Sequence, residues 1–191
     1  MKIAASSCSW WHHTLEEAVQ LAGEAGFKAF EPLMFPAEIF SLHGDLRNMT
    51  AQQLTRLLGD HGMVLAALHV AAIPTTPPAR FRACIDYNKR AIDVAGETGC
   101  GLVVVGGPDR ASEPFVPFLK ALDELLPLVE GTSVRIALEN HYGNWIQFIP
   151  DYEHIFDFLS SPNLGLTLDT GHFTAAGIDP ARLFVVRTGS E

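Results

Sequence analysis

The chain has 191 residues, of which 48% are hydrophobic and 18% are charged, and its formal net charge is −9. This length fits one domain with a substantial core, and the composition is typical of a globular protein. The negative charge argues against nucleic acid as the main partner. No apolar run reaches the roughly 18 residues that a membrane span requires. We therefore expect a single domain over residues 1–191, with no nucleic-acid partner and no membrane partner.

The amino terminus and the cysteines indicate a cytoplasmic protein. Only Ile3-Ala4-Ala5 separate Lys2 from the following serines, which is too short for the apolar core of a signal peptide. The three cysteines are odd in number and show no CxxC spacing, so reduced thiols are expected, with neither a disulfide framework nor a structural zinc site.

The chain alternates between short apolar runs and helical patterns. In chain order we predict a strand at residues 2–6, a helix from Thr14 to Gly26, a strand at 27–30, a helix from Thr50 to His61, a strand at 63–68, a helix at 80–97, a strand at 102–105, a helix at 115–129, a strand at 134–138, a helix at 150–159, a strand at 164–168 and the start of a helix at 181–184.

Two of these helices carry a capping box at their start. Thr14 with Glu17, and Thr50 with Gln53, have the spacing at which side chain and backbone can each satisfy the other's free N–H group.

Polar residues follow the apolar runs at regular intervals. The predicted strands end at Glu31, His69, Gly106, Glu139 and Asp169, which are 38, 37, 33 and 30 residues apart. A period of this size without hairpin signals predicts a parallel sheet with helical crossovers. Right-handed crossovers place the carboxyl ends of all strands on one face, so these residues should converge there.

Two architectures fit this alternation. A doubly wound sheet often has a glycine-rich phosphate turn after its first strand, but the corresponding segment 6–11 contains no glycine. A (βα)₈ TIM barrel has its site on the loops after the strands and typically needs about 250 residues. We therefore predict an α/β protein with an incomplete (βα)₈ TIM barrel, in which about six βα units are present and the last two are missing.

Glu139 and Asp169 are the leading candidates for a functional site. Each ends an apolar strand and is followed shortly by a histidine, His141 or His172. Carboxylate oxygens with one or two imidazole nitrogens suit a divalent metal cation such as Mn²⁺, Mg²⁺, Co²⁺ or Zn²⁺. A purely structural alternative is that each carboxylate caps the next helix or pairs with an arginine.

Other residues at the strand ends are candidates for supporting roles. His172 is a candidate metal ligand or substrate contact, and Asn140 and His141 are candidates for orienting Glu139. The remaining candidates for contact with a small substrate are His69, Glu31, Trp10, Trp11 and Trp145. Ordinary packing is the alternative for each tryptophan.

The segments Ala137-Leu138-Glu139-Asn140-His141 and Leu168-Asp169-Thr170-Gly171-His172 resemble those of the xylose isomerase-like TIM barrels. This superfamily includes sugar phosphate isomerases and epimerases, inosose dehydratases, hydroxypyruvate isomerases and AP endonucleases of the endonuclease IV type. The resemblance extends from residue 1 to about residue 183, and its short motifs do not separate the members.

The resemblance implies a divalent metal held by a Glu, an Asp, a His and a second Glu. The first two correspond to Glu139 and Asp169, while the other two come from a seventh and an eighth strand that this sequence lacks. In epimerase-like members the two Glu residues also move the proton beside a carbonyl, which implies that Glu139 is catalytic. The position of His172 is a substrate contact in the sugar enzymes and a zinc ligand in the endonucleases.

The expected function is that of a metal-dependent isomerase or epimerase acting on a small sugar or polyol. The alternatives are a dehydratase of the inosose type and a truncated remnant that binds sugar without turnover. The acidity of the chain disfavours an AP endonuclease. Because two metal ligands are missing, weak metal binding is expected. Strand edges left open by the missing quarter would be covered by a homo-oligomer or by another chain.

Overall fold

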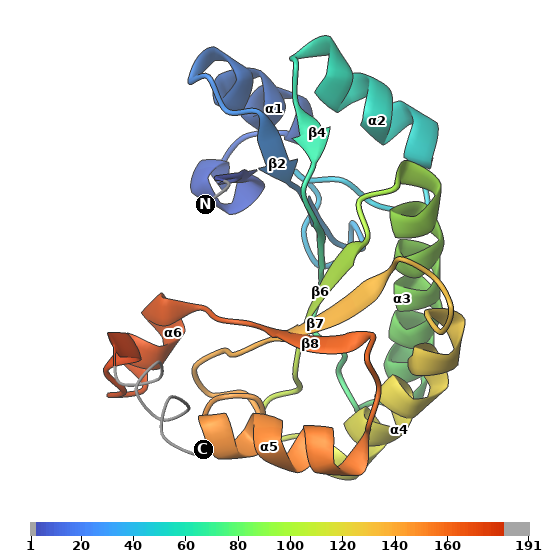
Figure 1. Cartoon of the computed structure of the whole chain (residues 1–191), viewed down its shortest axis with the longest axis vertical. Coiled ribbons are helices and arrows are strands. Elements are labelled where there is room, and N and C mark those ends of the chain that lie inside the picture. Colours follow the sequence, from blue (N-terminus) through green and yellow to red (C-terminus); the bar gives the residue numbers. More distant parts are fainter. Residues whose placement is uncertain (1–2, 182–191) are drawn as a thin grey trace, which may run out of the picture.

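The computed structural model describes residues 3–181, in which parallel strands lie inside a partial ring of helices (Figure 1). The strands are β1 (Ala5–Ser6), β2 (Ala29–Glu31), β3 (Leu33–Met34), β4 (Val64–Leu65), β5 (Leu68–Val70), β6 (Leu102–Gly106), β7 (Arg135–Glu139) and β8 (Leu164–Thr167). The α-helices are α1 (Leu15–Glu24), α2 (Ala51–Asp60), α3 (Pro78–Thr98), α4 (Phe115–Leu125), α5 (Ile149–Phe158) and α6 (Thr170–Ala175). Two 3₁₀ turns, η1 (Ser7–Trp10) and η2 (Leu126–Leu128), complete the elements.

All strand pairs are parallel, in the order β1-β2-β4 and β3-β5-β6-β7-β8. The two groups are linked by the chain itself, because β2 runs into β3 and β4 runs into β5. Pro32 separates β2 from β3, since proline has no N–H group to donate to the ladder. Its carbonyl still accepts a hydrogen bond from the N–H of His69, so the two segments remain side by side. The predicted α/β barrel arrangement is therefore confirmed for the part of the chain described.

Both predicted capping boxes are present. The N–H of Glu17 donates to Thr14 Oγ1 at 3.2 Å, and the N–H of Thr14 donates to Glu17 Oε2 at 2.8 Å. Thr50 and Gln53 exchange the same two bonds at the start of α2. These bonds satisfy N–H groups that have no partner inside the helix.

Two layers of apolar side chains hold the fold together. The larger layer lies between strands and helices and includes Phe30, Leu54, Phe118, Leu138 and Ile155. The face of the strands turned away from the helices carries a small cluster of Ala67, Val104 and Ala137, with Leu102 packed against it. Short side chains on this inner face leave space at the carboxyl ends of the strands.

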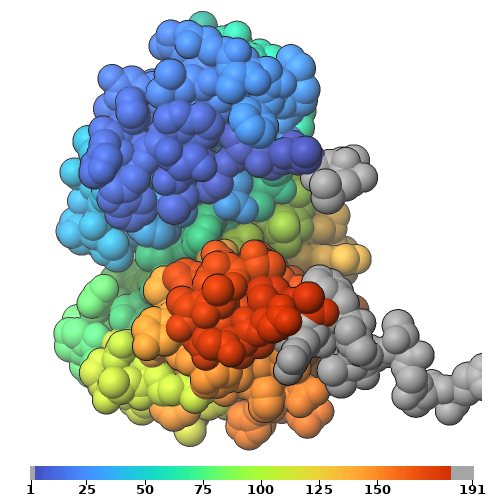
Figure 2. Space-filling view, turned by 90° about the vertical axis from the view of Figure 1, so that its left-hand side faces the viewer, coloured from blue at the N-terminus to red at the C-terminus, as the bar shows by residue number. Residues whose placement is uncertain are grey.

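The barrel is open within the described residues. β1 and β8 are terminal strands and do not pair with each other. Figure 2 shows the N-terminal segments and α6 on the same side of the molecule, separated by a recess. Leu166 on the terminal strand β8 is 42% exposed, as expected for a strand without a neighbour on one side. Among residues 3–181, no helix is both long and apolar enough to cross a membrane.

Several predicted boundaries are wrong. The first strand is only Ala5–Ser6, and Lys2 lies outside the described residues. The third strand is divided into β4 and β5, which places His69 in the middle of β5. No helix was predicted directly after Asp169, but α6 begins there, and the Asp169 side chain caps it, as in the structural alternative given for this carboxylate. The predicted helix at 181–184 lies almost entirely outside the described residues.

Tyr152 of α5 ties the ends of β7 and β8 together. Its hydroxyl donates to the carbonyl of Leu138 at 3.1 Å and lies 3.3 Å from the carbonyl of Thr167, and the side chain is buried. Burial raises the pKa of this phenol, so the hydroxyl keeps its proton and remains a donor.

Replacing Tyr152 with phenylalanine should lower the free energy of unfolding by about 1 kcal/mol, since one buried hydrogen bond is lost without a change in shape. Urea denaturation measures this loss. Tyr142→Phe changes an exposed tyrosine on the loop after β7. It is the matched control and should leave stability unchanged. Equal stabilities for the two variants would show that the Tyr152 hydroxyl does not hold the strand ends.

Candidate active site

A cavity of about 640 Å³ lies at the carboxyl ends of the strands. It is lined by residues from the carboxyl ends of several strands and from the segment after β1, including Cys8, Glu31, His69, Glu139, Asp169 and His172. In Figure 2 the recess between the N-terminal segments and α6 marks its open side, since Cys8 lines the cavity from one segment and His172 from the other. The structure thus brings together the carboxylates and imidazoles that the strand-end pattern singled out.

His69 lies between two carboxylates. Its Nε2 is 3.2 Å from Glu139 Oε2, which is hydrogen-bond distance, and its Nδ1 is 3.8 Å from Glu31 Oε1, which is the distance of an ion pair. All three side chains are largely buried, with exposures of 20%, 17% and 26% for His69, Glu139 and Glu31. Alternation along the strands explains the arrangement, because Glu139 and His69 lie on the same inner face as Ala137 and Ala67.

This burial changes the acidity of the cluster. Burial raises the pKa of Glu139, and the negative charges of Asp169 and Glu31 raise it further, against the opposing effect of His69. Burial acts to lower the pKa of His69, but the carboxylates of Glu31, Glu139 and Asp169 outweigh it and raise the pKa. Glu139 is therefore a stronger base than an exposed glutamate, and His69 holds its proton more tightly than an exposed histidine.

Asn140 positions Asp169. Its buried side chain donates from Nδ2 to the carbonyl of Asp169 and accepts the N–H of Asp169 on Oδ1, both at 2.8 Å. The predicted role of orienting Glu139 is not what these bonds do, because both are made to the backbone of Asp169. The Asn140 side chain thus extends the pairing of β7 with β8 by one step beyond the last strand residue.

The predicted metal ligands Glu139, Asp169 and His172 are not assembled into one set. Among residues 3–181, no three His, Cys, Asp or Glu side chains are grouped closely enough to hold a metal ion. Asp169 Oδ1 accepts the N–H of His172 at 2.8 Å, and the His172 ring packs against His141 with ring centroids 3.7 Å apart. Burial and the neighbouring His141 both lower the pKa of His172.

Glu139 and Asp169 nevertheless suit part of a cation site. Both residues line the active-site cavity. The negative charges of Asp169 and Glu31 raise the pKa of Glu139, and a bound cation would lower this pKa again. Two carboxylates match the oxygen ligands that hard divalent cations prefer. The chemistry of the donors fits such a cation, and these two residues would hold it.

Two of the three tryptophans, Trp10 and Trp145, are placed differently from the prediction. Trp10 packs against the core and Trp145 donates from Nε1 to the carbonyl of Glu113, and neither lines the cavity. Trp145 also stacks on Phe115 at 5.2 Å, so it fastens one loop to another. Trp11 is the tryptophan that lines the cavity, where it stacks on Phe40 at 4.1 Å.

Several other lining residues were not predicted, among them Cys8, Phe35, Arg80 and Asn144. Cys8 follows the first strand by two residues, so its position after a strand end was the available signal. Burial raises the pKa of its thiol, and the carboxylates of Glu139, Glu31 and Asp169 add to this effect. Arg80 carried no such signal because it lies inside a helix.

Comparisons with solved structures agree with this fold. A xylose isomerase-like TIM barrel protein from Mycobacterium smegmatis in complex with magnesium matches with a TM-score of 0.73 and 14% identity, over 90% of this chain and 65% of that chain. The IolI protein with a bound zinc atom matches with a TM-score of 0.73 and 19% identity, over 94% and 66%. A D-tagatose 3-epimerase-like protein matches with a TM-score of 0.69 and 23% identity, over 92% and 67%.

This chain therefore spans about two thirds of the length of the structures that it matches. No curated protein sequence matches it. The family model for the xylose isomerase-like TIM barrel matches residues 19–190, which confirms the resemblance carried by the Glu139 and Asp169 motifs. The chain belongs to the xylose isomerase-like TIM barrel family.

Proposed function

We propose that this chain is part of a metal-dependent sugar isomerase or epimerase and supplies the active-site carboxylates Glu139 and Asp169. In this proposal Glu139 moves a proton at the carbon beside a carbonyl of a small sugar or polyol. The observation that supports it is the convergence of Glu31, His69, Glu139 and Asp169 on one cavity. A base for this reaction should line the cavity that takes the substrate and have a pKa nearer to neutral than a free carboxylate, and Glu139 has both properties.

The other residues have roles that follow from their contacts. His69 holds Glu139 by its 3.2 Å contact and keeps the carboxylate turned into the cavity. Asn140 fixes the backbone of Asp169, and Glu139 and Asp169 would hold the divalent cation. A cation bound there would stabilise the negative charge that develops on the substrate oxygens when the proton is removed. Trp11 offers an apolar face against which a sugar ring or chain can lie.

The choice of a sugar rests on proteins of the same fold. They include an L-ribulose 3-epimerase and a D-allulose 3-epimerase in complex with D-allulose. The same fold also occurs in a probable 3-DHS dehydratase, AsbF, from Bacillus anthracis, which favours the dehydratase as the second candidate. Both reactions begin with removal of a proton beside a carbonyl, and a dehydratase then expels a hydroxyl group, so the mass of the product separates them.

Glu139→Gln should strongly slow the exchange of substrate hydrogen with solvent. With D-fructose and Mg²⁺ in deuterated water, we expect the wild-type chain to exchange the hydrogen beside the carbonyl, as followed by proton NMR. The variant should lose about 10²- to 10⁴-fold in rate, as is usual when a general base is removed. Glu153→Gln, at an exposed position of α5, is the control.

Two results would contradict this assignment. Exchange that persists in Glu139→Gln would remove Glu139 from the proton transfer. Sugar binding without any exchange in the wild-type chain would favour the alternative of a protein that binds sugar without turnover.

Glu139→Gln and Asp169→Asn should each weaken Mn²⁺ binding by at least about tenfold, because each removes an anionic ligand. Electron paramagnetic resonance of free Mn²⁺ during a titration measures this affinity. Asparagine also caps helices, so Asp169→Asn keeps the start of α6. Asp123→Asn, exposed on α4, should bind as the wild type does. Unchanged affinity in both site variants would exclude a cation at these two carboxylates.

The His69 cluster should make stability depend on pH. The pKa of His69 is raised in the folded protein, so its contribution to stability is complete below the pKa of the unfolded chain and is lost as the pH rises through the folded value. The raised pKa of Glu139 acts in the same direction. The contribution of His69 to the free energy of unfolding should therefore fall as the pH rises above about 6.5, the ordinary pKa of histidine.

His69→Gln should reduce this fall, whereas His12→Gln, at an exposed histidine, should not. Urea denaturation at a series of pH values measures the difference. The same pH dependence of stability in His69→Gln and in the wild type would show that the carboxylates do not stabilise a protonated His69.

A further inference from the structure

Arg80 lies where three cavities meet. It lines the candidate active-site cavity, a groove of about 400 Å³ between α3 and residues 36–47, and a third cavity of about 460 Å³ beside Gly107 and Glu113. Ile39 is shared by the first two, and Asn144 by the first and third. The side chain is therefore at the entrance to the active-site cavity and is exposed there.

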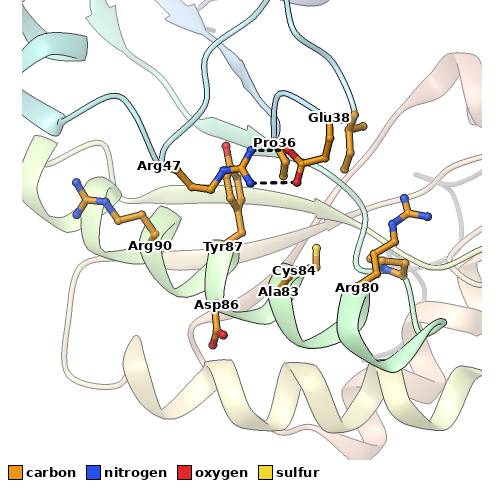
Figure 3. Close-up of a pocket in the computed structure, with 11 residues that line it drawn as sticks. Pro36, Glu38, Arg47, Arg80, Ala83, Cys84, Asp86, Tyr87 and Arg90 are labelled. Carbon is orange, nitrogen blue, oxygen red and sulfur yellow. Dashed lines mark hydrogen bonds and ion pairs between the residues drawn. The ribbon is translucent and has the colours of Figure 1, made fainter.

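The charge of Arg80 has no partner within the described part of the chain. Arg47 pairs with Asp45 and Glu38, and most other described arginines also pair with a carboxylate. Within residues 3–181, Arg80 and Arg135 have no carboxylate at ion-pair distance, and of these two only Arg80 lines the active-site cavity. Figure 3 shows this contrast, with dashed contacts joining Arg47 to Glu38 and none reaching Arg80, which extends from the first turn of α3.

The position of Arg80 is not explained by helix stability. α3 has 21 residues, with no acidic residue in its first turn and no side-chain bond at its N-cap Pro77. A positive charge in the first turn opposes the helix dipole, which favours negative charge at that end. The guanidinium would gain from an anion, because a phosphate or a carboxylate accepts two parallel hydrogen bonds from it.

The other charged residues of the active-site cavity determine where such an anion can bind. Glu31, Glu139 and Asp169 repel an anion, and Arg80 is the only lysine or arginine among the described residues that line this cavity. An anionic substrate is therefore oriented with its charge at Arg80 and its uncharged part towards Glu139.

We propose that Arg80 is a specificity-determining residue that binds an anionic group, a phosphate or a carboxylate, at the end of the substrate remote from the reacting carbon. The substrate class is then a sugar phosphate or a sugar acid. This inference rests on the proposed function for the identity of the reacting end, but the anion site itself depends only on Arg80 and the cavities around it.

The test compares three ketoses that differ at one carbon: D-fructose, D-fructose 6-phosphate and D-fructuronate. Binding to the full chain is measured by calorimetry in the presence of Mg²⁺. At least one of the two anionic sugars should bind the wild type more tightly than D-fructose, and the one preferred identifies phosphate or carboxylate as the group recognised. Arg80→Gln should weaken binding of that sugar by about 10- to 100-fold and leave D-fructose unaffected.

Two variants serve as controls. Arg80→Lys should keep part of the preference, because lysine retains the charge but not the paired donors. Arg90→Gln removes a charge from the groove beside α3 without touching the active-site cavity, and it should bind all three sugars as the wild type does. Circular dichroism confirms that each variant is folded.

The proposal is overturned if the anionic sugars bind the wild type no more tightly than D-fructose, or if Arg80→Gln keeps the preference. The two proposals fail separately. If Arg80→Gln loses the preference for the anionic sugar but Glu139→Gln leaves hydrogen exchange unchanged, the anion site is retained and the proposed catalysis is rejected. The opposite pair of results would retain the catalysis and reject the anion site.

Discussion

The site depends on the parallel pairing of β6, β7 and β8. In this ladder Gly106 pairs with Glu139, and Glu139 pairs with Thr167, so the three strands end at the same level. Beyond that level the side chain of Asn140 continues the hydrogen bonding between β7 and β8, because it bonds both the N–H and the carbonyl of Asp169. The distance between the two carboxylate-bearing segments is therefore set by hydrogen bonds, and the surrounding loops do not have to determine it.

This alignment gathers negative charge in a protein that is already acidic. Glu31, Glu139 and Asp169 line one cavity, and the raised pKa values of Glu139 and His69 record their mutual effect. Three kinds of positive charge can balance them: the protonated His69, the guanidinium of Arg80 at the entrance, and a divalent cation. His69 is adjacent to Glu139 whereas Arg80 is at the rim, so the first stabilises the carboxylate and the second is left to act on a ligand.

Positions could be predicted best from the sequence where the local pattern of residues determines the structure. Glu139 ends an apolar run in a parallel sheet, so its position at the strand end followed from strand periodicity alone. Thr14 and Glu17 were equally predictable because the capping box is local. Trp10 and Trp11 were not separable, since the 3₁₀ turn Ser7–Trp10 decides which ring faces the core. Asn140 and Arg80 depend on partners, or on their absence, far along the chain, which a single sequence does not reveal.

His172 illustrates how the fold separates two roles that the family resemblance leaves open. The backbone N–H of His172 uses only one oxygen of Asp169, so the second oxygen remains able to contact a cation while the cap is kept. The imidazole of His172, by contrast, packs on His141 and would have to leave that contact to become a ligand beside Asp169. As a donor or acceptor to a substrate hydroxyl it can act from where it lies, because it already lines the cavity. This arrangement supports the proposal of Asp169 as a cation ligand and His172 as a substrate contact.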